Sequence, residues 1–255
     1  MANKSVHLPI APLGSSMRVD NWWAGPVATV LVLSSFIGYA TWRAFEGDAY
    51  AWGAYLSPFY SPFFDVRWAH SFGLGFFTPA MLILPGPASF RFTCYYYRKA
   101  YYRAFAWDPP ACAVGERAPH RYHGEARLLL FQNLHRFAMY VAVVFLVVLW
   151  KDAIDAIFRW SDGVHVGVGT LVMLLNVVLL SGYTFGCHSF RHLIGGSMNA
   201  YSTGIGALRY KLWKGVTVLN ERHMAFAWMS LFSVALTDLY IRSVATGAIT
   251  DLRLF

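Results

Sequence analysis

The chain has 255 residues, of which 57% are apolar and only 13% are charged. Soluble domains are roughly half apolar and a quarter charged, so this composition excludes a soluble protein. The formal net charge of +8 would suit nucleic-acid binding, but the basic residues lie between long apolar segments rather than along one face. They are interpreted as topology-determining charges, and we expect an integral membrane protein surrounded by lipid, with no nucleic-acid partner.

Five apolar segments are long enough to cross a bilayer, for which about 20 mostly apolar residues are needed. The whole chain, 1–255, is therefore predicted to be one all-α, polytopic transmembrane domain with five spanning helices. The helices are expected over 24–45, 69–99, 128–152, 163–192 and 216–246.

The second predicted helix holds Pro85-Gly86-Pro87 at mid-membrane depth. Two prolines this close should break a helix, because each removes a backbone donor and crowds the preceding turn. In lipid such a break is tolerated only where protein or a cavity satisfies the freed carbonyls. The segment 100–126 is expected to be a polar loop large enough to dock on a partner outside the membrane.

The distribution of Lys and Arg predicts the orientation, because basic loops stay in the cytoplasm. The loops after the second and fourth predicted helices are strongly basic, whereas the other two carry as many acidic residues as basic ones or more. The prediction is a multi-pass protein of the inner (cytoplasmic) membrane, with the N-terminus cytoplasmic and the C-terminus outside.

Segments 69–150 and 163–246 look like two copies of one unit. The clearest match is Phe-x-Cys-x-x-aromatic-Arg-basic, which begins at Phe92 in one copy and at Phe185 in the other. Both copies run in the same direction, so their symmetry axis would lie along the membrane normal. The four later helices are then expected to form a pseudo-two-fold four-helix bundle, with the helix 24–45 packed outside it.

Two cysteines and two histidines are matched by this repeat, one on each helix of the bundle: Cys94, His135, Cys187 and His223. At 1.5 Å per residue, all four fall in one layer roughly 10 Å below the cytoplasmic interface. Ionisable residues inside a membrane usually mark function, and four converging soft or borderline ligands indicate a metal centre.

Several centres would suit these ligands. A single zinc ion is possible but would have no evident purpose there. A Rieske-type [2Fe–2S] cluster takes two Cys on one iron and two His on the other, which matches the symmetry. The rival is haem b between His135 and His223, with a second haem between His70 and His165 nearer the outer face. The matched cysteines narrowly favour the iron–sulfur cluster over haem.

The topology, the diagonal histidines and the basic loops resemble the membrane anchor of succinate dehydrogenase and fumarate reductase, most of all its single-chain, five-helix, actinobacterial type. The pair His135-Arg136, preceded by Gln132-Asn133, is similar to a His-Arg pair near the quinone pocket of that family. The first helix has no histidine, unlike the dihaem members. The resemblance implies docking of a soluble iron–sulfur subunit and a flavoprotein subunit on the cytoplasmic side, and electron transfer to quinone.

A quinone carbonyl needs hydrogen-bond donors at the edge of an apolar slot. The predicted donors, all within about two turns of the ligand layer, are Gln132, Arg136, Tyr183 and Trp228, although Tyr and Trp are also common in the interfacial aromatic belt. Two other functions remain open: a b-type dihaem cytochrome anchor of another respiratory dehydrogenase, and a non-redox transporter that uses Asn176 and Asp238 as intramembrane polar residues.

Overall fold

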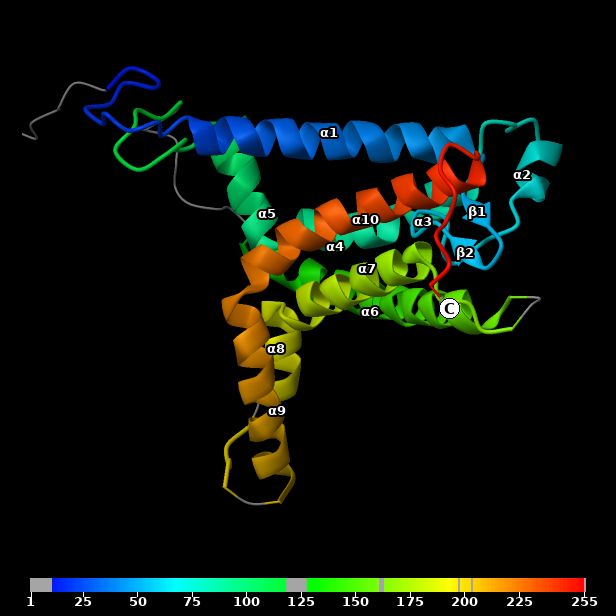
Figure 1. The fold of residues 1–255 in the computed structure, drawn as a ribbon. Coiled ribbons are helices and arrows are strands. Elements are labelled where there is room, and N and C mark those ends of the chain that lie inside the picture. The colour runs from blue at the N-terminus through cyan, green and yellow to red at the C-terminus, as the bar shows by residue number, and fades with distance from the viewer. Residues whose placement is uncertain (1–10, 118–127, 161–162, 197, 203, 255) are drawn as a thin grey trace, which may run out of the picture.

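The computed structural model describes residues 11–117, 128–160, 163–196, 198–202 and 204–254. Long helices run side by side in it and form a bundle (Figure 1). They are α1 (Ala24–Glu46), α6 (Leu128–Phe158), α7 (Val168–Phe185) and α10 (His223–Ala245), with α3 (Pro79–Ile83) and α4 (Pro85–Thr93) among them. The described strands are two residues each, β1 (Ala51–Trp52) and β2 (Tyr55–Leu56), paired antiparallel in the loop after α1.

Within the described residues, three helices are long and apolar enough to cross a membrane by length and composition: α1, α7 and α10. Helix α6 is 31 residues long and packs against α4 and α7, while α10 packs against α7. The expected all-α membrane architecture is confirmed. The number of five spanning helices stays a prediction.

The second predicted helix, 69–99, is divided in the structure. Its first part is the short helix α2 (Arg67–Ser71), and its last part is α5 (Tyr95–Ala100), which continues into a π-helix over Tyr101–Phe105. The expected interruption at Pro85 coincides with the α3–α4 boundary, but Leu84 keeps helical angles (φ −58°, ψ −33°). Pro85 is thus accommodated in the first turn of α4, where no backbone donor is needed.

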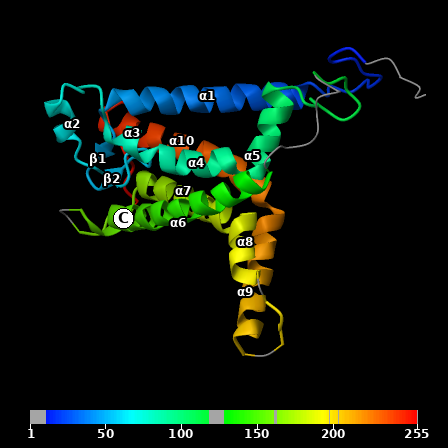
Figure 2. The same ribbon diagram turned by 180° about the vertical axis from the view of Figure 1, so that it is seen from behind.

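This segment is also not helical over 72–78, between α2 and α3, and it breaks again at Cys94, whose ψ of 131° is extended. The predicted helix 163–192 is interrupted in the same way at Cys187 (ψ 149°), where α8 (His188–Gly195) begins. The predicted helix 216–246 bends at Arg222 (ψ 14°), because α9 (Gly204–Glu221) precedes α10. The expectation of continuous helices over 163–192 and 216–246 is therefore wrong, and the segment 69–99, for which a break was expected at Pro85, is broken at Cys94 as well. The breaks at Cys94 and Cys187 turn α5 and α8 across the bundle direction, and α9 also runs across it before the bend at Arg222 leads into α10 (Figures 1 and 2).

The two cysteines of the proposed repeat share one local conformation. Each follows a helix of the bundle, has an extended backbone, and stands at the N-cap of a short helix that turns away. This similarity agrees with the sequence match around them. The internal repeat over 69–150 and 163–246 itself stays a prediction.

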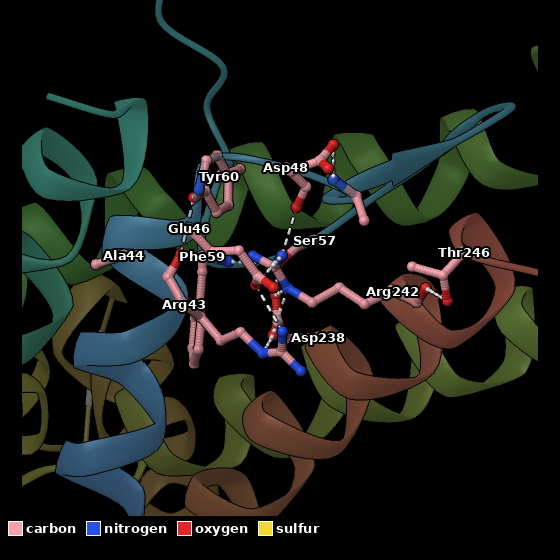
Figure 3. Close-up of polar contacts among 12 residues, drawn as sticks. Arg43, Ala44, Glu46, Asp48, Ser57, Phe59, Tyr60, Asp238, Arg242 and Thr246 are labelled. Carbon is pink, nitrogen blue, oxygen red and sulfur yellow. Dashed lines mark hydrogen bonds and ion pairs between the residues drawn. The ribbon is translucent and has the colours of Figure 1, made fainter. Parts of the chain in front are cut away.

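A buried charge network joins α1 to α10 at the opposite end of the bundle (Figure 3). Arg242 donates from Nε to both carboxylate oxygens of Asp238 at 3.0 Å and from Nη1 to Glu46 at 2.8 Å. Asp238 also accepts from Tyr39 Oη at 2.6 Å and from Ser57. These contacts compensate much of the cost of burying the charges, although the buried Arg242 Nη2 has no hydrogen-bond partner among the described residues.

Candidate functional site

The structure buries all four predicted metal ligands at the end of the bundle where the helices break. Cys94 and Cys187 lie in the same hydrophobic cluster, and His223 is the first residue of α10. The Cys94 Sγ lies 3.7 Å from the His223 Nε2. The breaks thus bring a thiol and an imidazole from distant parts of the chain into contact.

Aromatic rings fix the orientation of both imidazoles. The His135 ring stacks on Phe90, with centroids 4.7 Å apart and planes 5° apart, and its Nδ1 lies 2.9 Å from Thr93 Oγ1. The His223 ring stacks on Tyr183 at 5.0 Å and 15°. Its Nδ1 is buried and has no hydrogen-bond partner. Since buried polar atoms are nearly always paired, this orphaned nitrogen marks a position where a ligand fits.

A cavity of about 650 Å³ lies between these histidines and the basic end of the bundle. Cys94, His135 and His223 line it, and so do His188 and His192 of α8. Both histidines follow Cys187 closely in the sequence, at the start and in the middle of α8. The turn at Cys187 brings both to the cavity.

The two-Cys, two-His set is not assembled as a ready-made site. Cys187 is fully buried but does not line the cavity, and its Sγ accepts a hydrogen bond from the Phe190 amide at 3.4 Å. Within the part of the chain that the structure describes, no group of three or more His, Cys, Asp or Glu side chains stands close enough to hold a metal ion. Cys94 and His223 are in contact, but binding of one cofactor by all four residues needs a change in side-chain positions, that of Cys187 included.

The four predicted quinone residues do not form one pocket. Gln132 and Arg136 line the 650 Å³ cavity, where an Arg136 Nη2 lies 3.3 Å from His192 Nδ1. Trp228 lines a second cavity of about 430 Å³ between α1, α5 and the start of α10. Tyr183 is buried between the rings of Phe90 and His223. The two cavities are adjacent, because Tyr96 lines both.

Arg91 is a site residue that the sequence interpretation missed. Its guanidinium lies 4.7 Å from the centroid of the Tyr183 ring and donates to the Tyr97 hydroxyl at 2.6 Å. It also donates to the Ala227 carbonyl at 3.1 Å and to Ser230 Oγ at 2.9 Å. An arginine within an apolar spanning segment is itself a signal of function, and it could have been recognised here.

The predicted outer pair of histidines has other partners. His70 is exposed, and its Nε2 lies 2.9 Å from its own Phe77 carbonyl. His165 is buried against Trp160, with centroids 4.2 Å apart, and its Nε2 lies 3.5 Å from the Asp251 carboxylate. These contacts give no support to a haem between them.

Asp251 fastens the C-terminal segment to the bundle. Its carboxylate accepts from the Tyr240 and Tyr55 hydroxyls at 2.6 and 2.8 Å and from the Gly169 amide at 2.9 Å. Burial by itself would raise the pKa of this carboxyl, but the hydrogen bonds outweigh it and hold the pKa below its usual value.

Comparison with known proteins gives these features a context. Residues 24–247 match the family model described as "Actinobacterial succinate dehydrogenase subunit SdhC". The chain belongs to this SdhC family. Among solved structures, it is similar to a chain of the Mycobacterium smegmatis Sdh1 complex in the apo form, with 42% identity, a TM-score of 0.83 and coverage of 98% of both chains. No curated protein matches it.

Membership of the SdhC family confirms the resemblance drawn from the loops, topology and histidines. The chain is thus an SdhC membrane subunit of succinate dehydrogenase. This finding favours the succinate dehydrogenase reading over an anchor of another dehydrogenase. It also argues against a transporter, as does the pairing of Asn176 Oδ1 with Ser233 Oγ at 3.1 Å and of Asp238 within the charge network.

Proposed function

We propose that this SdhC subunit carries electrons from a soluble iron–sulfur subunit to quinone through a redox centre held beside Cys94 and His223. The observation that carries the proposal is the buried contact of 3.7 Å between the Cys94 thiol and the His223 imidazole, next to a cavity lined by further imidazoles. A thiol, imidazoles and an orphaned Nδ1 in one buried place suit a metal cofactor better than a purely structural anchor.

For the cofactor we propose a Rieske-type [2Fe–2S] cluster held by Cys94, Cys187, His135 and His223. Imidazole ligation raises the reduction potential well above that of an all-thiolate cluster, which suits the delivery of electrons to a quinone. The position of Cys94 and Cys187 at two equivalent helix breaks supports the choice. Haem b between His135 and His223 is the alternative, supported by their lining one cavity.

The residues around the ligands hold them in place. Phe90 and Tyr183 fix the planes of the two imidazoles, and Thr93 Oγ1 sets the orientation of His135 through its Nδ1. Such outer partners orient metal ligands and tune their basicity. The Arg91 guanidinium, held by Tyr97 and Ser230, supplies a fixed positive charge beside the site. A fixed cation stabilises electron-rich states nearby.

The quinone headgroup is assigned to the 430 Å³ cavity, which adjoins the ligand Cys94 through Tyr96. Its walls include Trp22, Tyr97 and Trp228, and a mixture of apolar walls with a few polar groups is typical of small-molecule sites. Gln132 and Arg136 then belong to the cofactor cavity. Oxidation of succinate releases two electrons and two protons, and the quinone takes up two of each to become a quinol.

The partners are proposed to be the soluble iron–sulfur and flavoprotein subunits, docked at the end of the bundle where α5, α8 and α9 lie. This is the basic end, which the positive-inside rule places in the cytoplasm, with the N-terminus inside and the C-terminus outside. The similarity to a chain of an Sdh1 complex supports such partners.

The decisive experiment compares cysteine variants of the assembled complex. Cys94→Ala and Cys187→Ala should each abolish quinone reduction and a rhombic electron paramagnetic resonance signal of the membrane subunit. Succinate oxidation with a soluble artificial acceptor should be unchanged. Ser243→Ala is the control, because it removes a side chain of similar size near the far end of α10, where Ser243 Oγ donates to the Leu239 carbonyl of the same helix, and it should retain full activity.

Two outcomes would contradict parts of this proposal. A strong b-type α band that survives both cysteine substitutions, without any rhombic signal beyond those of the soluble subunits, would replace the cluster by haem. For the quinone, Trp228→Leu should raise the KM severalfold while Gln132→Leu changes mainly the spectrum of the cofactor. The reverse result would move the headgroup to the 650 Å³ cavity.

A further inference from the structure

The hairpin formed by α8 and α9 projects sideways from one end of the bundle (Figure 1). Both helices run across the direction of α7 and α10, and the view from behind shows the same arrangement (Figure 2). Helices α7 and α10 have the length and composition to cross the bilayer. A hairpin that leaves their ends crosswise therefore extends along the membrane plane, beside the bundle.

One face of α9 is occupied by α8. The Arg191 guanidinium lies 4.3 Å from the Trp213 ring centroid and donates from Nε to Thr217 Oγ1 at 3.0 Å. Arg209 donates from Nε to the Ile194 carbonyl at 2.9 Å. The polar groups on this face are thus paired within the hairpin, which gives it a defined shape.

The two flanks of α9 beside this face differ in chemistry. One flank carries Ile205, Leu208 and Leu212 at helical spacing, and these side chains are 78%, 59% and 51% exposed. Lys211, three residues after Leu208, borders this row, and Lys214 lies on the far side of the helix from it. Single exposed apolar residues are common on any protein, but a row of them bordered and backed by lysines on a helix in the membrane plane is typical of an interfacial amphipathic helix.

We propose that α9 lies in the interfacial layer of the bilayer, with Ile205, Leu208 and Leu212 among the acyl chains and Lys211 and Lys214 at anionic lipid headgroups. The occupant of the apolar flank is lipid because the hairpin leaves the bundle at the end of two spanning helices. The lysines beside and behind this row also match the negative charge of phospholipid headgroups.

The hairpin connects two of the predicted ligands directly. Cys187 precedes the first residue of α8, and one residue, Arg222, separates the end of α9 from His223. Immersion of α9 therefore holds both residues at a fixed depth. The inference about lipid rests on the geometry of α9 and holds with either cofactor, while its consequence for the site rests on the proposed function.

The test places a fluorescent bimane label at Leu208→Cys or at Lys214→Cys in the complex reconstituted into bilayers containing phosphatidylglycerol, in a Cys112→Ala background. The label at 208 should be quenched severalfold more by doxyl-labelled lipid than the label at 214. Iodide in the water should quench them in the opposite order. Leu212→Cys should repeat the result at 208.

Equal quenching of both labels by iodide would overturn the proposal, because the apolar flank would then face water. Shielding of the label at 208 from both quenchers would also overturn it, because a protein subunit would then cover this flank. Succinate oxidation with a soluble acceptor checks that each labelled complex is assembled. The redox proposal is tested separately with Cys94→Ala. If this variant loses quinone reduction but keeps the quenching pattern, the position of α9 in the membrane does not depend on the redox centre.

Discussion

Removal of the Asp238 carboxylate should destabilise the packing of α1 on the bundle. In the network of Figure 3, Arg43 and Arg242 carry two positive charges, and Asp238 and Glu46 carry two negative ones. Asp238 and Arg242 are almost completely buried, at 0% and 3% exposure. In Asp238→Leu the network keeps both arginines but only the partly exposed Glu46 opposite them, so one buried positive charge loses its partner.

The loss of one partner from a buried ion pair costs about 3–5 kcal/mol. For a chain of this size, 1 kcal/mol corresponds to about 2–4 °C in the midpoint of thermal unfolding, so the midpoint should fall by roughly 6–20 °C. The double variant Asp238→Leu/Arg242→Leu keeps the remaining pair, Arg43 and Glu46, neutral. It should lose clearly less stability than the sum of the two single variants.

The assay is thermal unfolding of the complex in detergent, followed by the circular dichroism of the helices and by protease access to the loop between α1 and β1. Tyr39→Phe is the matched control, because it removes one hydrogen bond of 2.6 Å to Asp238 and no charge. Its cost should be about 1 kcal/mol. If Asp238→Leu shifts the midpoint no more than Tyr39→Phe does, or if the two single effects simply add, the network does not hold α1 in place.

Three further predictions concern other parts of the chain. Gly195→Ala should weaken the packing of α8 on α9 by about 1–3 kcal/mol, because an added Cβ would lie 2.1 Å from Trp213 Cδ1. Gly215→Ala is the control and should not weaken it, because an added Cβ there meets nothing within 4 Å. Limited proteolysis of α9 compares the two variants. The folded-state pKa of the Asp251 carboxyl lies below the usual value of about 3.9, so its contacts with the bundle should be intact above that pH and be lost as the pH falls below it. Hydrogen exchange at the Gly169 amide measures this loss, and Asp251→Asn should abolish the pH dependence. A reporter active only outside the cytoplasm should give signal when fused at the C-terminus and none within 109–117, and the reverse result would invert the proposed orientation.

The composition and apolar segments of the sequence were sufficient to predict an all-α membrane protein, because a bilayer allows few structures other than helices with internal hydrogen bonds. The family resemblance was confirmed too, on loop charge and a few residues such as His135 and Arg136. These features depend on local composition and spacing along the chain, which a single sequence displays directly.

The details of the site could not be predicted in the same way. Cys94 and His223 were expected in one layer, and they do meet at 3.7 Å. The separation of Gln132 from Trp228 into two cavities was not foreseen, because helix bends redirect side chains that a straight helix would align. Arg91 was not predicted, because a guanidinium is not a metal ligand, although its charge within an apolar segment is visible in the sequence.

Three of the breaks in the predicted helices lie beside the candidate site. The chain leaves helical geometry at Cys94, at Cys187 and at Arg222, next to His223. Within a bilayer an interrupted helix loses backbone hydrogen bonds, so it persists only where protein or the interface satisfies the freed groups. Here Asn220 Nδ2 donates to the Gly186 carbonyl at 2.7 Å, and the Cys187 thiol accepts the Phe190 amide. Departures from local rules concentrate where function requires them. The breaks at Cys94 and Cys187 turn α5 and α8 aside, and the bend at Arg222 returns the chain from α9 to the bundle. Together they place the Cys94 thiol at the His223 imidazole and both residues at the 650 Å³ cavity, which three straight helices could not do.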